Sequence, residues 1–392
     1  MRIFLFHYYS KKPNPVYQEM ATSFRMRGHE VWLAEPDPDG RLAIKGAKGI
    51  ERLIDGVASS PAGGKRLPLI GNLSSRQEMF SFLGRVKNVI RELSPNIVQV
   101  NPPNMAWYLP MGMPSSMQFV LDIRQINEAV NKTVKTQIRE RLNIESMRFN
   151  GRFAYKKTCF CHEQAAIRIL GDSWQKLGAV VPVGVDDQFI EFQYPNEPVT
   201  LKPARTFVYI GTLSRLRNLE KLLEAARHLC HKTDQFQLDL IGPDTSNGYY
   251  QQVIDQLGIQ SVAAVKTAVP YNEVPELLST YDVGLAYVPD RPTWHYQPTI
   301  KALEYRALGL PIISTNVASH REIIEQNKNG LLCEDTPEDI ADAMYQLIGS
   351  PERYNDVKQN ARDMRQGNSW LTIADMYLSK VYQPLMREVS HR

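Results

Sequence analysis

The most constraining feature of this chain is an alternation of apolar, strand-like runs with helical segments that starts again near the middle. Arg2–His7 is such a run, followed by a helical pattern over Tyr17–Arg27 and a second strand-like run over His29–Ala34. Gly28, just past the helical segment, is a typical helix stop. This order of strand, loop, helix and strand predicts a parallel βαβ unit and hence an α/β protein.

The same alternation of strand-like and helical segments recurs in the second half of the chain. Thr206–Ile210 is predicted to form a strand, Leu219–His231 a helix and Gln237–Ile241 the next strand, after a proline-rich linker. With 392 residues, the chain is longer than the roughly 250–300 residues that one hydrophobic core usually serves. We therefore expect two doubly wound Rossmann-like domains, over residues 1–195 and 204–369.

The rest of the first half gives less regular patterns. We expect Asn127–Cys161 to form one long or broken helical stretch, Ala166–Leu170 a strand, and Val180–Val185 the last strand-like run. Cys159, Cys161 and His162 are close enough in sequence to suggest a metal site, but no second pair of ligands has a useful spacing. Reduced thiols packed near the end of a helix are the expected arrangement, and no metal is expected.

Composition and missing motifs exclude several classes of protein. The net charge of +4 is too small for a dedicated nucleic-acid binder. Neither half has the glycine fingerprint of a nicotinamide or flavin enzyme, a P-loop, or a hydrolase nucleophile elbow. The N-terminal apolar run ends at Phe6 and no membrane-spanning run follows, so we expect a cytoplasmic location. The glycosylation sequons at Asn72 and Asn131 are then chance matches.

The most informative stretch runs from Tyr296 to Thr315. Pro298 precedes a predicted helix start and Thr299 is a good N-cap residue, so free backbone N–H groups are expected there. Such a helix start binds anions, and a diphosphate suits it. Glu304 lies about five residues further, roughly 7–8 Å along the axis at 1.5 Å per residue. This rise is comparable to the distance between the diphosphate and the ribose hydroxyls of one nucleotide. A solvated glutamate on an amphipathic helix is the alternative.

This stretch resembles the retaining GT-B glycosyltransferases of family 4, also called glycosyl transferases group 1. In that family a proline, a lysine and a glutamate precede an Ala-x-Gly-x-Pro turn into a strand. Three other segments resemble the family's motifs in the expected order, and the resemblance is strongest over residues 180–350; these segments are Val181–Phe189, Tyr209–Leu219 and Val269–Leu285. The resemblance implies two Rossmann-like domains facing a central cleft, with a C-terminal helix, residues 370–392, crossing back onto the first domain.

The resemblance also implies which residues form the site for a nucleotide-sugar donor. The residues it assigns to catalysis are Glu304, Arg217, Lys301 and Asp122. The residues it assigns to donor binding are Gly211, Thr212, Leu213, Arg215, Gly242, Val269, Tyr271, Tyr296, Gln297, Pro298, Thr299 and Ile300. Cations and the helix N-terminus would ease departure of the nucleoside diphosphate, so neither a cofactor nor a metal is expected.

The chain departs from the family pattern at several positions. Thr212 stands where an arginine is common, although Arg215 could substitute for it. Tyr296 replaces the first of two glutamates, which helps to hold the donor sugar in the family. Leu121 precedes Asp122 where many members have a His-Asp pair. These departures leave the donor sugar open.

The implied reaction moves a sugar, with retention of configuration, to a saccharide or lipid-linked acceptor, as in the synthesis of cell-surface polysaccharide or glycolipid. Residues 131–157 carry eight Lys and Arg against two Glu, a pattern typical of a solvated helix or of contact with an anionic membrane. The acceptor is expected on the first domain, near the loops that follow its strands. Two alternatives remain: a catalytically degenerate subunit that binds a nucleotide-sugar, and a GT-B-fold sugar-nucleotide epimerase.

Overall fold

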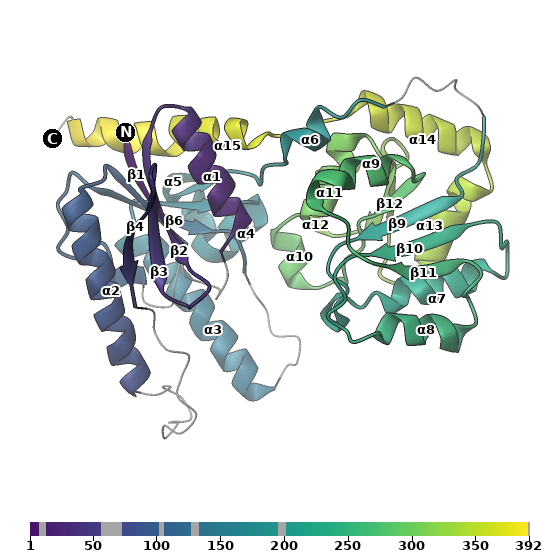
Figure 1. Cartoon of the computed structure of the whole chain (residues 1–392), viewed down its shortest axis with the longest axis horizontal. Helices are drawn as coiled ribbons and strands as arrows, with labels where there is room; N and C mark the ends of the chain where they lie inside the picture. The colour runs from purple at the N-terminus through teal and green to yellow at the C-terminus, as the bar shows by residue number, and fades with distance from the viewer. Residues whose placement is uncertain (8–12, 56–72, 102–105, 127–132, 195–200, 391–392) are drawn as a thin grey trace. The chain divides into compact units, whose positions relative to one another are not determined.

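The computed structural model describes residues 1–7, 13–55, 73–101, 106–126, 133–194 and 201–390. They divide into two compact units, residues 1–184 with 370–392 and residues 185–369. Each unit is a sheet with helices, which confirms the predicted α/β architecture of two Rossmann-like domains (Figure 1). The sequons at Asn72 and Asn131 lie outside the described residues.

The first unit contains an eight-stranded sheet in the order β4-β3-β2-β1-β5-β6-β7-β8. Its strands are β1 (Arg2–His7), β2 (Glu30–Pro36), β3 (Leu42–Gly46), β4 (Gly49–Ile54), β5 (Ile97–Asn101), β6 (Gln118–Ile123), β7 (Lys157–Phe160) and β8 (Gly178–Val180). Strand β1 pairs in parallel with both β2 and β5, as the βαβ prediction requires. Strands β3 and β4 form an antiparallel extension at one edge, which the sequence analysis did not predict.

The first unit also contains seven helices and several shorter turns within its described residues. They are α1 (Pro15–Met26), α2 (Leu73–Leu93), α3 (Val134–Phe149), α4 (Glu163–Leu170), α5 (Trp174–Leu177), α15 (Trp370–Tyr377) and α16 (Gln383–Ser390), together with short turns η1 (Ala106–Tyr108), η2 (Asn150–Ala154), η3 (Gly171–Ser173) and η6 (Leu378–Tyr382). Helix α1 begins where Asn14 caps it, since the Asn14 side chain accepts a hydrogen bond of 3.0 Å from the Val16 N–H. None of the helices in the described ranges is both long and apolar enough to cross a membrane.

Three predicted elements of the first unit are wrong. Residues 166–170 belong to helix α4, because Ala165, Ala166, Ile169 and Leu170 form the buried face of a helix and not a strand. The helical stretch predicted to reach Cys161 ends at Ala154, and strand β7 follows it. The last strand ends at Val180, before most of the run predicted over 180–185.

The second unit contains a six-stranded parallel sheet in the order β11-β10-β9-β12-β13-β14. Its strands are β9 (Thr206–Ile210), β10 (Gln237–Ile241), β11 (Ala263–Lys266), β12 (Val283–Leu285), β13 (Ile312–Thr315) and β14 (Gly330–Cys333). The strand order reverses between β9 and β12. Ligands of such sheets bind outside the carboxyl ends of the strands, at this point of reversal.

Helices cover both faces of the second sheet (Figure 1). They are α6 (Asp187–Ile190), α7 (Glu220–Leu229), α8 (Tyr249–Leu257), α9 (Val274–Ser279), α10 (Pro292–Tyr296), α11 (Ile300–Leu308), α12 (Ala318–Arg321), α13 (Pro337–Ile348) and α14 (Pro351–Asp363), with turns η4 (Arg215–Arg217) and η5 (Tyr271–Glu273). Along β9, Phe207 and Tyr209 face one core and Val208 faces the other. Side chains alternate across a strand, so β9 supports both cores.

The division between the units differs from the predicted linker. The second unit begins at Val185 and not near residue 204. The reason is that Val185 and Phe189 are buried in the same core cluster as Leu278 and Tyr305. Residues 185–194 therefore form part of the second unit, ahead of the linker.

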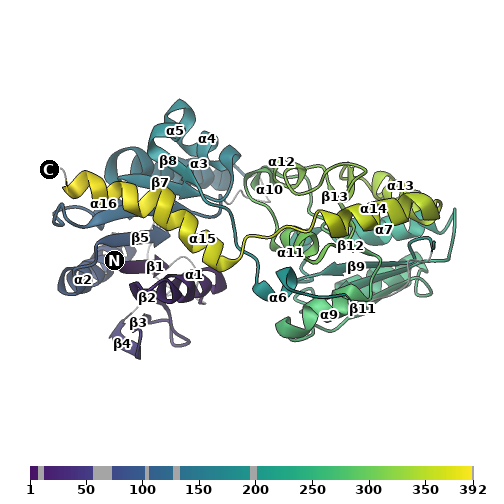
Figure 2. The ribbon, with the colours of Figure 1, turned by 90° about the horizontal axis from the view of Figure 1, so that it is seen from above.

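The C-terminal helices pack with the first unit. Figure 2 shows α15 and α16 running along the first sheet, with α15 beside α1. Ile373, Tyr377 and Tyr382 are fully buried there, in one cluster with Tyr17 and Phe24. The Arg27 guanidinium also pairs with the Asp375 carboxylate at 2.5 Å. Two segments from opposite ends of the chain thus complete one hydrophobic core.

Candidate functional site

Two glycines end neighbouring strands of the second sheet and bring their backbones together. Gly211 follows β9 with a φ of 144°, and Gly242 follows β10 with a φ of 149°. A side chain at Gly242 would place its Cβ 2.0 Å from the Gly211 carbonyl oxygen. Only glycine fits this conformation and this approach. Leu213 is buried behind the turn and its N–H donates to the Pro243 carbonyl at 3.0 Å, whereas Thr212 is exposed.

The turn η4 places two arginines in different surroundings. The half-buried Arg217 guanidinium lies 4.7 Å from the centre of the Trp294 ring. Its Nη1 atom is buried and has no hydrogen-bond partner among the described residues. Arg215 is exposed, and its guanidinium lies 4.1 Å from the centre of the Tyr249 ring. Arg217 is thus the arginine with a buried donor still available, and Arg215 rests on α8.

Helix α11 begins where the sequence predicted. Pro298 precedes it, Thr299 is its N-cap, and Gly309 ends it in the left-handed conformation with a φ of 78°. The Thr299 hydroxyl accepts a hydrogen bond of 3.4 Å from the Ala302 N–H. The helix N-terminus, with its partial positive charge, therefore starts at Ile300, whose side chain is exposed.

A histidine that the sequence analysis did not single out lies behind the N-cap. His320 is fully buried, its Nε2 lies 3.1 Å from the Thr299 hydroxyl, and its Nδ1 lies 2.6 Å from the Ser314 hydroxyl. Burial, with the nearby charge of Lys301, lowers the pKa of His320 to about 3. The imidazole is therefore neutral at physiological pH and acts as a hydrogen-bonding support for Thr299. No spacing in the sequence indicates this contact, which links two residues 21 positions apart.

Lys301 is a buried cation at the first turn of α11. Its Nζ lies 4.7 Å from the centre of the Tyr209 ring, and its Cε lies 3.4 Å from the position of a Cβ on Gly211. Burial, reinforced by the charge of Arg217 and opposed by that of Glu304, lowers the pKa of Lys301 to about 7. Arg217 and Lys301 thus lie together near the helix N-terminus, and Glu304 is the carboxylate that partly balances their charge. This arrangement favours an anionic ligand.

Glu304 is buried on the second turn of α11, with 6% of its surface exposed. The Tyr271 hydroxyl donates a hydrogen bond of 2.8 Å to its Oε1. Burial raises the pKa of Glu304, an effect opposed by the Tyr271 hydrogen bond and the charge of Lys301. The Tyr271 ring packs 5.7 Å from that of Phe189, which fixes its direction. The alternative of a solvated glutamate is therefore wrong.

The remaining residues assigned to the donor lie around this helix. Tyr296 ends α10, and Gln297 and Pro298 connect α10 to α11; all three are partly exposed. Val269 is partly buried and precedes the η5 turn that carries Tyr271. Helix α10 is held beside α12, since the Ser319 hydroxyl donates to the Trp294 carbonyl at 2.5 Å.

Asp122 lies on β6 of the first unit. It is fully buried in the first unit, where its carboxylate accepts hydrogen bonds from the Tyr17 hydroxyl at 2.8 Å, Gln99 at 3.0 Å and the Tyr377 hydroxyl at 2.9 Å. The Arg124 guanidinium is 3.1 Å away. A carboxylate with all these partners is a structural element of the core. The assignment of Asp122 to catalysis is not supported by these surroundings.

The cysteine pair of the first unit is also structural. Cys159 and Cys161 are buried free thiols, and burial raises the pKa of both. His162 is the N-cap of α4, where its Nδ1 accepts a hydrogen bond of 3.1 Å from the Gln164 N–H. Within the described ranges no three His, Cys, Asp or Glu side chains are grouped as metal ligands.

A family model and several known proteins match part of this chain in sequence. Residues 193–364 match the family model described as "Glycosyl transferases group 1". Spore coat protein SA of Bacillus subtilis is 25% identical over 188 residues, 45% of this chain and 48% of that protein. D-inositol 3-phosphate glycosyltransferase of Corynebacterium urealyticum is 26% identical over 191 residues, 46% of this chain and 43% of the relative. The matched part thus spans about half the length of these relatives.

Solved structures match the chain over nearly its whole length. Sucrose-phosphate synthase from Thermosynechococcus elongatus has a TM-score of 0.73 at 15% identity and covers 99% of both chains. WaaG, a glycosyltransferase involved in lipopolysaccharide biosynthesis, has a TM-score of 0.67 at 15% identity, covering 98% of this chain and 99% of its own. Anabaena HepE in complex with UDP-glucose has a TM-score of 0.64 at 14% identity, covering 100% and 99%. These likenesses show the GT-B fold.

Proposed function

Since the second unit carries a glycosyl transferases group 1 domain over residues 193–364, we propose that this protein is a glycosyltransferase that uses a nucleotide-sugar donor. The observation that carries the proposal is the grouping of Arg217, Lys301 and Glu304 around the N-terminal half of α11. The group lies at the carboxyl edge of the second sheet, beside the turns after β9 and β10. A nucleoside diphosphate has the charges and the diol that such a group recognises.

The diphosphate is proposed to lie at the N-terminus of α11. Arg217 offers the buried Nη1 that has no partner among the described residues, and Lys301 supplies a second cation. The turn at Gly211 and Gly242 allows a close approach of the backbone, since neither residue has a side chain. These groups bind the phosphates in the ground state and stabilise the charge that develops on the leaving group.

Glu304 is proposed to hold the ribose. Tyr271 hydrogen-bonds to Oε1, which orients the carboxylate and leaves its other oxygen for the two hydroxyls of a ribose. A buried carboxylate gains more from such contacts than an exposed one, because water does not compete for it.

In the proposed reaction, the bond between the sugar C1 and the diphosphate oxygen breaks while a bond to an acceptor hydroxyl oxygen forms. The acceptor proton leaves with the nucleoside diphosphate, so that atoms and charges balance. Retention of configuration and the absence of a required metal follow from the family resemblance, with cations and the helix N-terminus in the place of a metal. Activity that survives EDTA would support the second point.

The acceptor is proposed to be a saccharide or a lipid-linked saccharide bound by the first unit.

Apolar side chains on α3 and η2 are exposed in a row with spacings of four and seven residues; these are Val134, Ile138, Leu142, Phe149 and Phe153. Phe153 is 76% exposed, and its ring lies 5.6 Å from that of Phe149. Exposed Lys135, Arg139 and Arg141 flank the row. Apolar and basic groups together suit an anionic membrane surface, and we propose that this face docks there.

The proposal is tested with UDP first, because the comparison structures of HepE contain UDP and UDP-glucose. Calorimetry with UDP, with Arg217→Ala as the second protein, is expected to show binding that depends on Arg217. A panel of nucleotide-sugars is then incubated with the wild type, and slow donor hydrolysis or transfer is expected for at least one donor. A protein that binds no nucleoside diphosphate would refute the site.

The same panel separates the rival functions. Binding without any turnover would support a degenerate nucleotide-sugar-binding subunit, an idea favoured by the replacements at Thr212 and Tyr296. Recovery of an epimerised nucleotide-sugar would support an epimerase. Transfer to a saccharide acceptor supports the glycosyltransferase.

A further inference from the structure

The turn η4, which carries Arg217, is in contact with a short segment that precedes the donor helix. Arg291 of this segment donates hydrogen bonds to the residues on both sides of Arg217. Its Nη1 lies 3.4 Å from the Leu216 carbonyl oxygen, and its Nη2 lies 3.3 Å from Oδ1 of Asn218. The Trp294 ring lies against the Arg217 guanidinium, at 4.7 Å from its centre. Three consecutive residues of the turn therefore contact the same segment.

The stack on Trp294 can orient the Arg217 side chain without using its hydrogen-bond donors. Nη1 of Arg217 is buried and has no hydrogen-bond partner among the described residues. A ring against the face of a guanidinium leaves the N–H groups, which lie in the guanidinium plane, available to an oxyanion. Tryptophan is also the aromatic side chain that attracts a cation most strongly.

The segment that carries Trp294 is anchored independently of the turn. The Ser319 hydroxyl donates a hydrogen bond of 2.5 Å to the Trp294 carbonyl oxygen. The Ala318 N–H donates to Nδ1 of His295 at 3.2 Å, and Nε2 of His295 lies 2.7 Å from Oδ1 of Asp290. Contacts with α12 therefore fix this segment, so it can serve as a support for the turn.

The turn has a further support at its two ends. The Tyr250 hydroxyl of α8 donates to the Ser214 carbonyl oxygen at 2.7 Å and accepts from the Leu219 N–H at 3.4 Å. Because these contacts close the turn, it should stay folded when the contacts from residues 291–294 are removed. What is then lost is the fixed direction of the Arg217 side chain.

We propose that Trp294 and Arg291 are positioning residues for Arg217, and that they hold its guanidinium where the diphosphate of the donor binds. Trp294 acts on the side chain of Arg217, and Arg291 acts on the chain on each side of it. The inference rests on the proposed function, because it needs a diphosphate at Arg217. It adds to that function two residues that act through Arg217 and not through the ligand.

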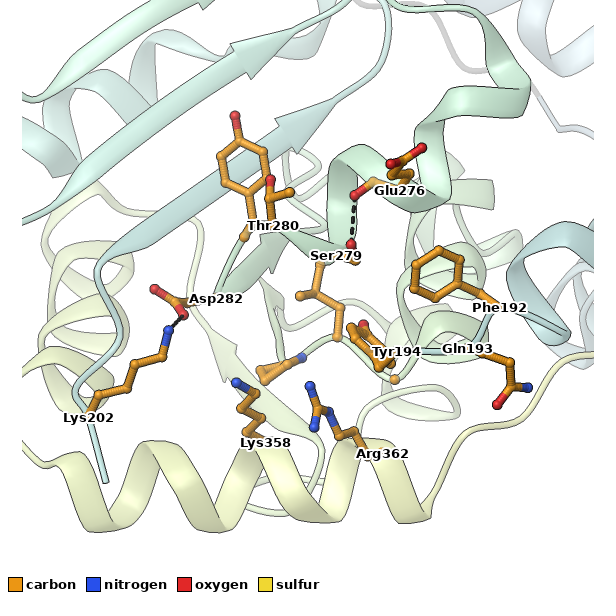
Figure 3. A pocket seen from close by; sticks show the side chains of 14 residues that line it. Phe192, Gln193, Tyr194, Lys202, Glu276, Ser279, Thr280, Asp282, Lys358 and Arg362 are labelled. Carbon is orange, nitrogen blue, oxygen red and sulfur yellow. Dashed lines mark hydrogen bonds and ion pairs between the residues drawn. The ribbon is translucent and has the colours of Figure 1, made fainter. Parts of the chain in front are cut away.

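A pocket of the same unit offers a matched control for the stack on Trp294 (Figure 3). This pocket lies at the opposite edge of the sheet from Arg217, since its lining includes residues just before β9, β12 and β13, namely Lys202, Asp282 and Pro311. The Arg362 guanidinium lies 4.3 Å from the centre of the Tyr194 ring there. Tyr194→Leu thus removes the same kind of contact away from the donor site.

Arg353 is the matched control for Arg291. Its Nη2 donates a hydrogen bond of 2.6 Å to Oδ1 of Asn327. Asn327 and Asn218 both have a left-handed backbone, with φ of 63° and 50°. Arg353→Gln therefore removes an arginine from a left-handed asparagine on another part of the unit.

Binding of UDP, GDP and ADP to the full chain is measured by calorimetry, and the ligand that binds most tightly is used for all variants. We expect Trp294→Leu to weaken binding about fivefold or more, the scale of a cation–π contact. Arg291→Gln should weaken it about threefold or more, the scale of one hydrogen bond. Trp294→Phe keeps a ring and should retain most of the affinity, whereas Tyr194→Leu and Arg353→Gln should bind as the wild type does.

A double-mutant cycle separates positioning from direct contact with the ligand. If Trp294 acts through Arg217, the variant Arg217→Ala/Trp294→Leu should bind within about twofold of Arg217→Ala alone. Losses that multiply in the double variant would show that Trp294 acts separately from Arg217 and would overturn the inference. The urea midpoint of each variant is measured in parallel, and the same cycle with Arg291→Gln decides the question if Trp294→Leu does not fold.

The controls distinguish failure of this inference from failure of the proposed function. Unchanged affinity in Trp294→Leu and Arg291→Gln, with the expected loss in Arg217→Ala, would overturn the inference and leave the donor site in place. Equal losses in Tyr194→Leu and Arg353→Gln would assign the effect to a general change in the unit and overturn it as well. A wild type that binds none of the three nucleotides would overturn the proposed function and this inference together.

Discussion

The hydroxyl of Tyr271 lies 2.8 Å from Oε1 of Glu304 and donates a hydrogen bond to it, although the two residues are 33 positions apart. One carboxylate oxygen is thereby engaged and the carboxylate plane is fixed. The other oxygen is the part of Glu304 that a ribose can reach. This contact makes the role of Glu304 testable by changing either the protein or the sugar.

We expect Glu304→Gln to lose most transferase activity while the fold survives, because the amide lacks the charge that strengthens bonds to a diol. A 2′-deoxy donor should be a poor substrate for the wild type, and the variant should distinguish less between ribo and deoxy donors. Steady-state kinetics with paired donors measure both effects. Near-full activity with the same ribo preference would place the donor elsewhere.

Whether Glu304→Gln still folds can be checked by comparing its stability with that of the wild type at different pH values. Burial raises the pKa of Glu304 above its unfolded value, so ionisation of Glu304 opposes folding at pH values above that raised pKa. The cost disappears as the pH falls below the unfolded pKa, where the group is protonated in both states. Urea unfolding should therefore show the variant to be at least as stable as the wild type at neutral pH, with a difference that shrinks in acid.

Proton uptake should accompany the binding of UDP through Lys301. The pKa of Lys301 is lowered to about 7, so at pH 8 its amine is mostly neutral in the free protein. The phosphates favour the ammonium form, which predicts uptake of protons and weaker binding as pH rises from 7 to 9. Calorimetry in buffers of different ionisation enthalpy measures the uptake. Lys301→Met should abolish it, and undiminished uptake in that variant would assign the protons to another group.

Arg217→Ala is expected to weaken UDP binding by roughly 1.5–3 kcal/mol, the scale of a hydrogen bond to a charged group. Arg215→Ala is the matched control, because it removes the same charge two residues away from an exposed side chain that rests on Tyr249. It should change the binding free energy by about 0.5 kcal/mol or less, as surface substitutions usually do. Equal losses in the two variants would contradict the distinction between the two arginines.

The N-cap of α11 should be measurable as stability. Thr299→Val removes the hydroxyl that accepts from Ala302 and contacts His320, which predicts a loss of about 1 kcal/mol in the free energy of unfolding. Thr299→Ser keeps the hydroxyl and should stay close to the wild type. Urea unfolding followed by circular dichroism compares the three proteins. Identical midpoints for Val and Ser would show that the cap contributes nothing.

Membrane docking should depend on the exposed aromatic pair of the first unit. Phe149→Ser/Phe153→Ser is expected to lower partitioning onto vesicles containing anionic lipid by about tenfold or more, since burying a phenylalanine contributes about 1.5–3 kcal/mol when complete. Met26→Ser/Met111→Ser removes two exposed apolar side chains from other elements and serves as the control. Vesicle flotation at low and high salt gives the measurement. Equal partitioning of both variants would exclude docking through this face.

The features that local sequence determines were predicted best. Helix α11 begins after Pro298 and ends at Gly309 because a proline and a left-handed glycine act on their immediate neighbours. Ala166–Leu170 misled the prediction, since a short apolar run suits a buried strand and a half-buried helix equally.

The contacts that depend on tertiary structure could not be predicted. Nothing in the sequence indicates that His320 supports Thr299, or that Tyr271 reaches Glu304. The surroundings of Asp122 could not be predicted either, because its place in a family pattern says nothing of its neighbours Tyr17 and Tyr377, which come from opposite ends of the chain.

The first unit is built from two stretches of chain, since residues 370–392 close its core after the whole second unit has intervened. During synthesis, the ribosome releases all of residues 185–369 before Tyr377 and Tyr382 exist to meet Asp122 and Gln99. Domains usually fold as they emerge, the N-terminal one first. Here all residues of the second unit are synthesised before the last segment of the first, so the core of the first unit can be completed only after residues 370–392 have been made.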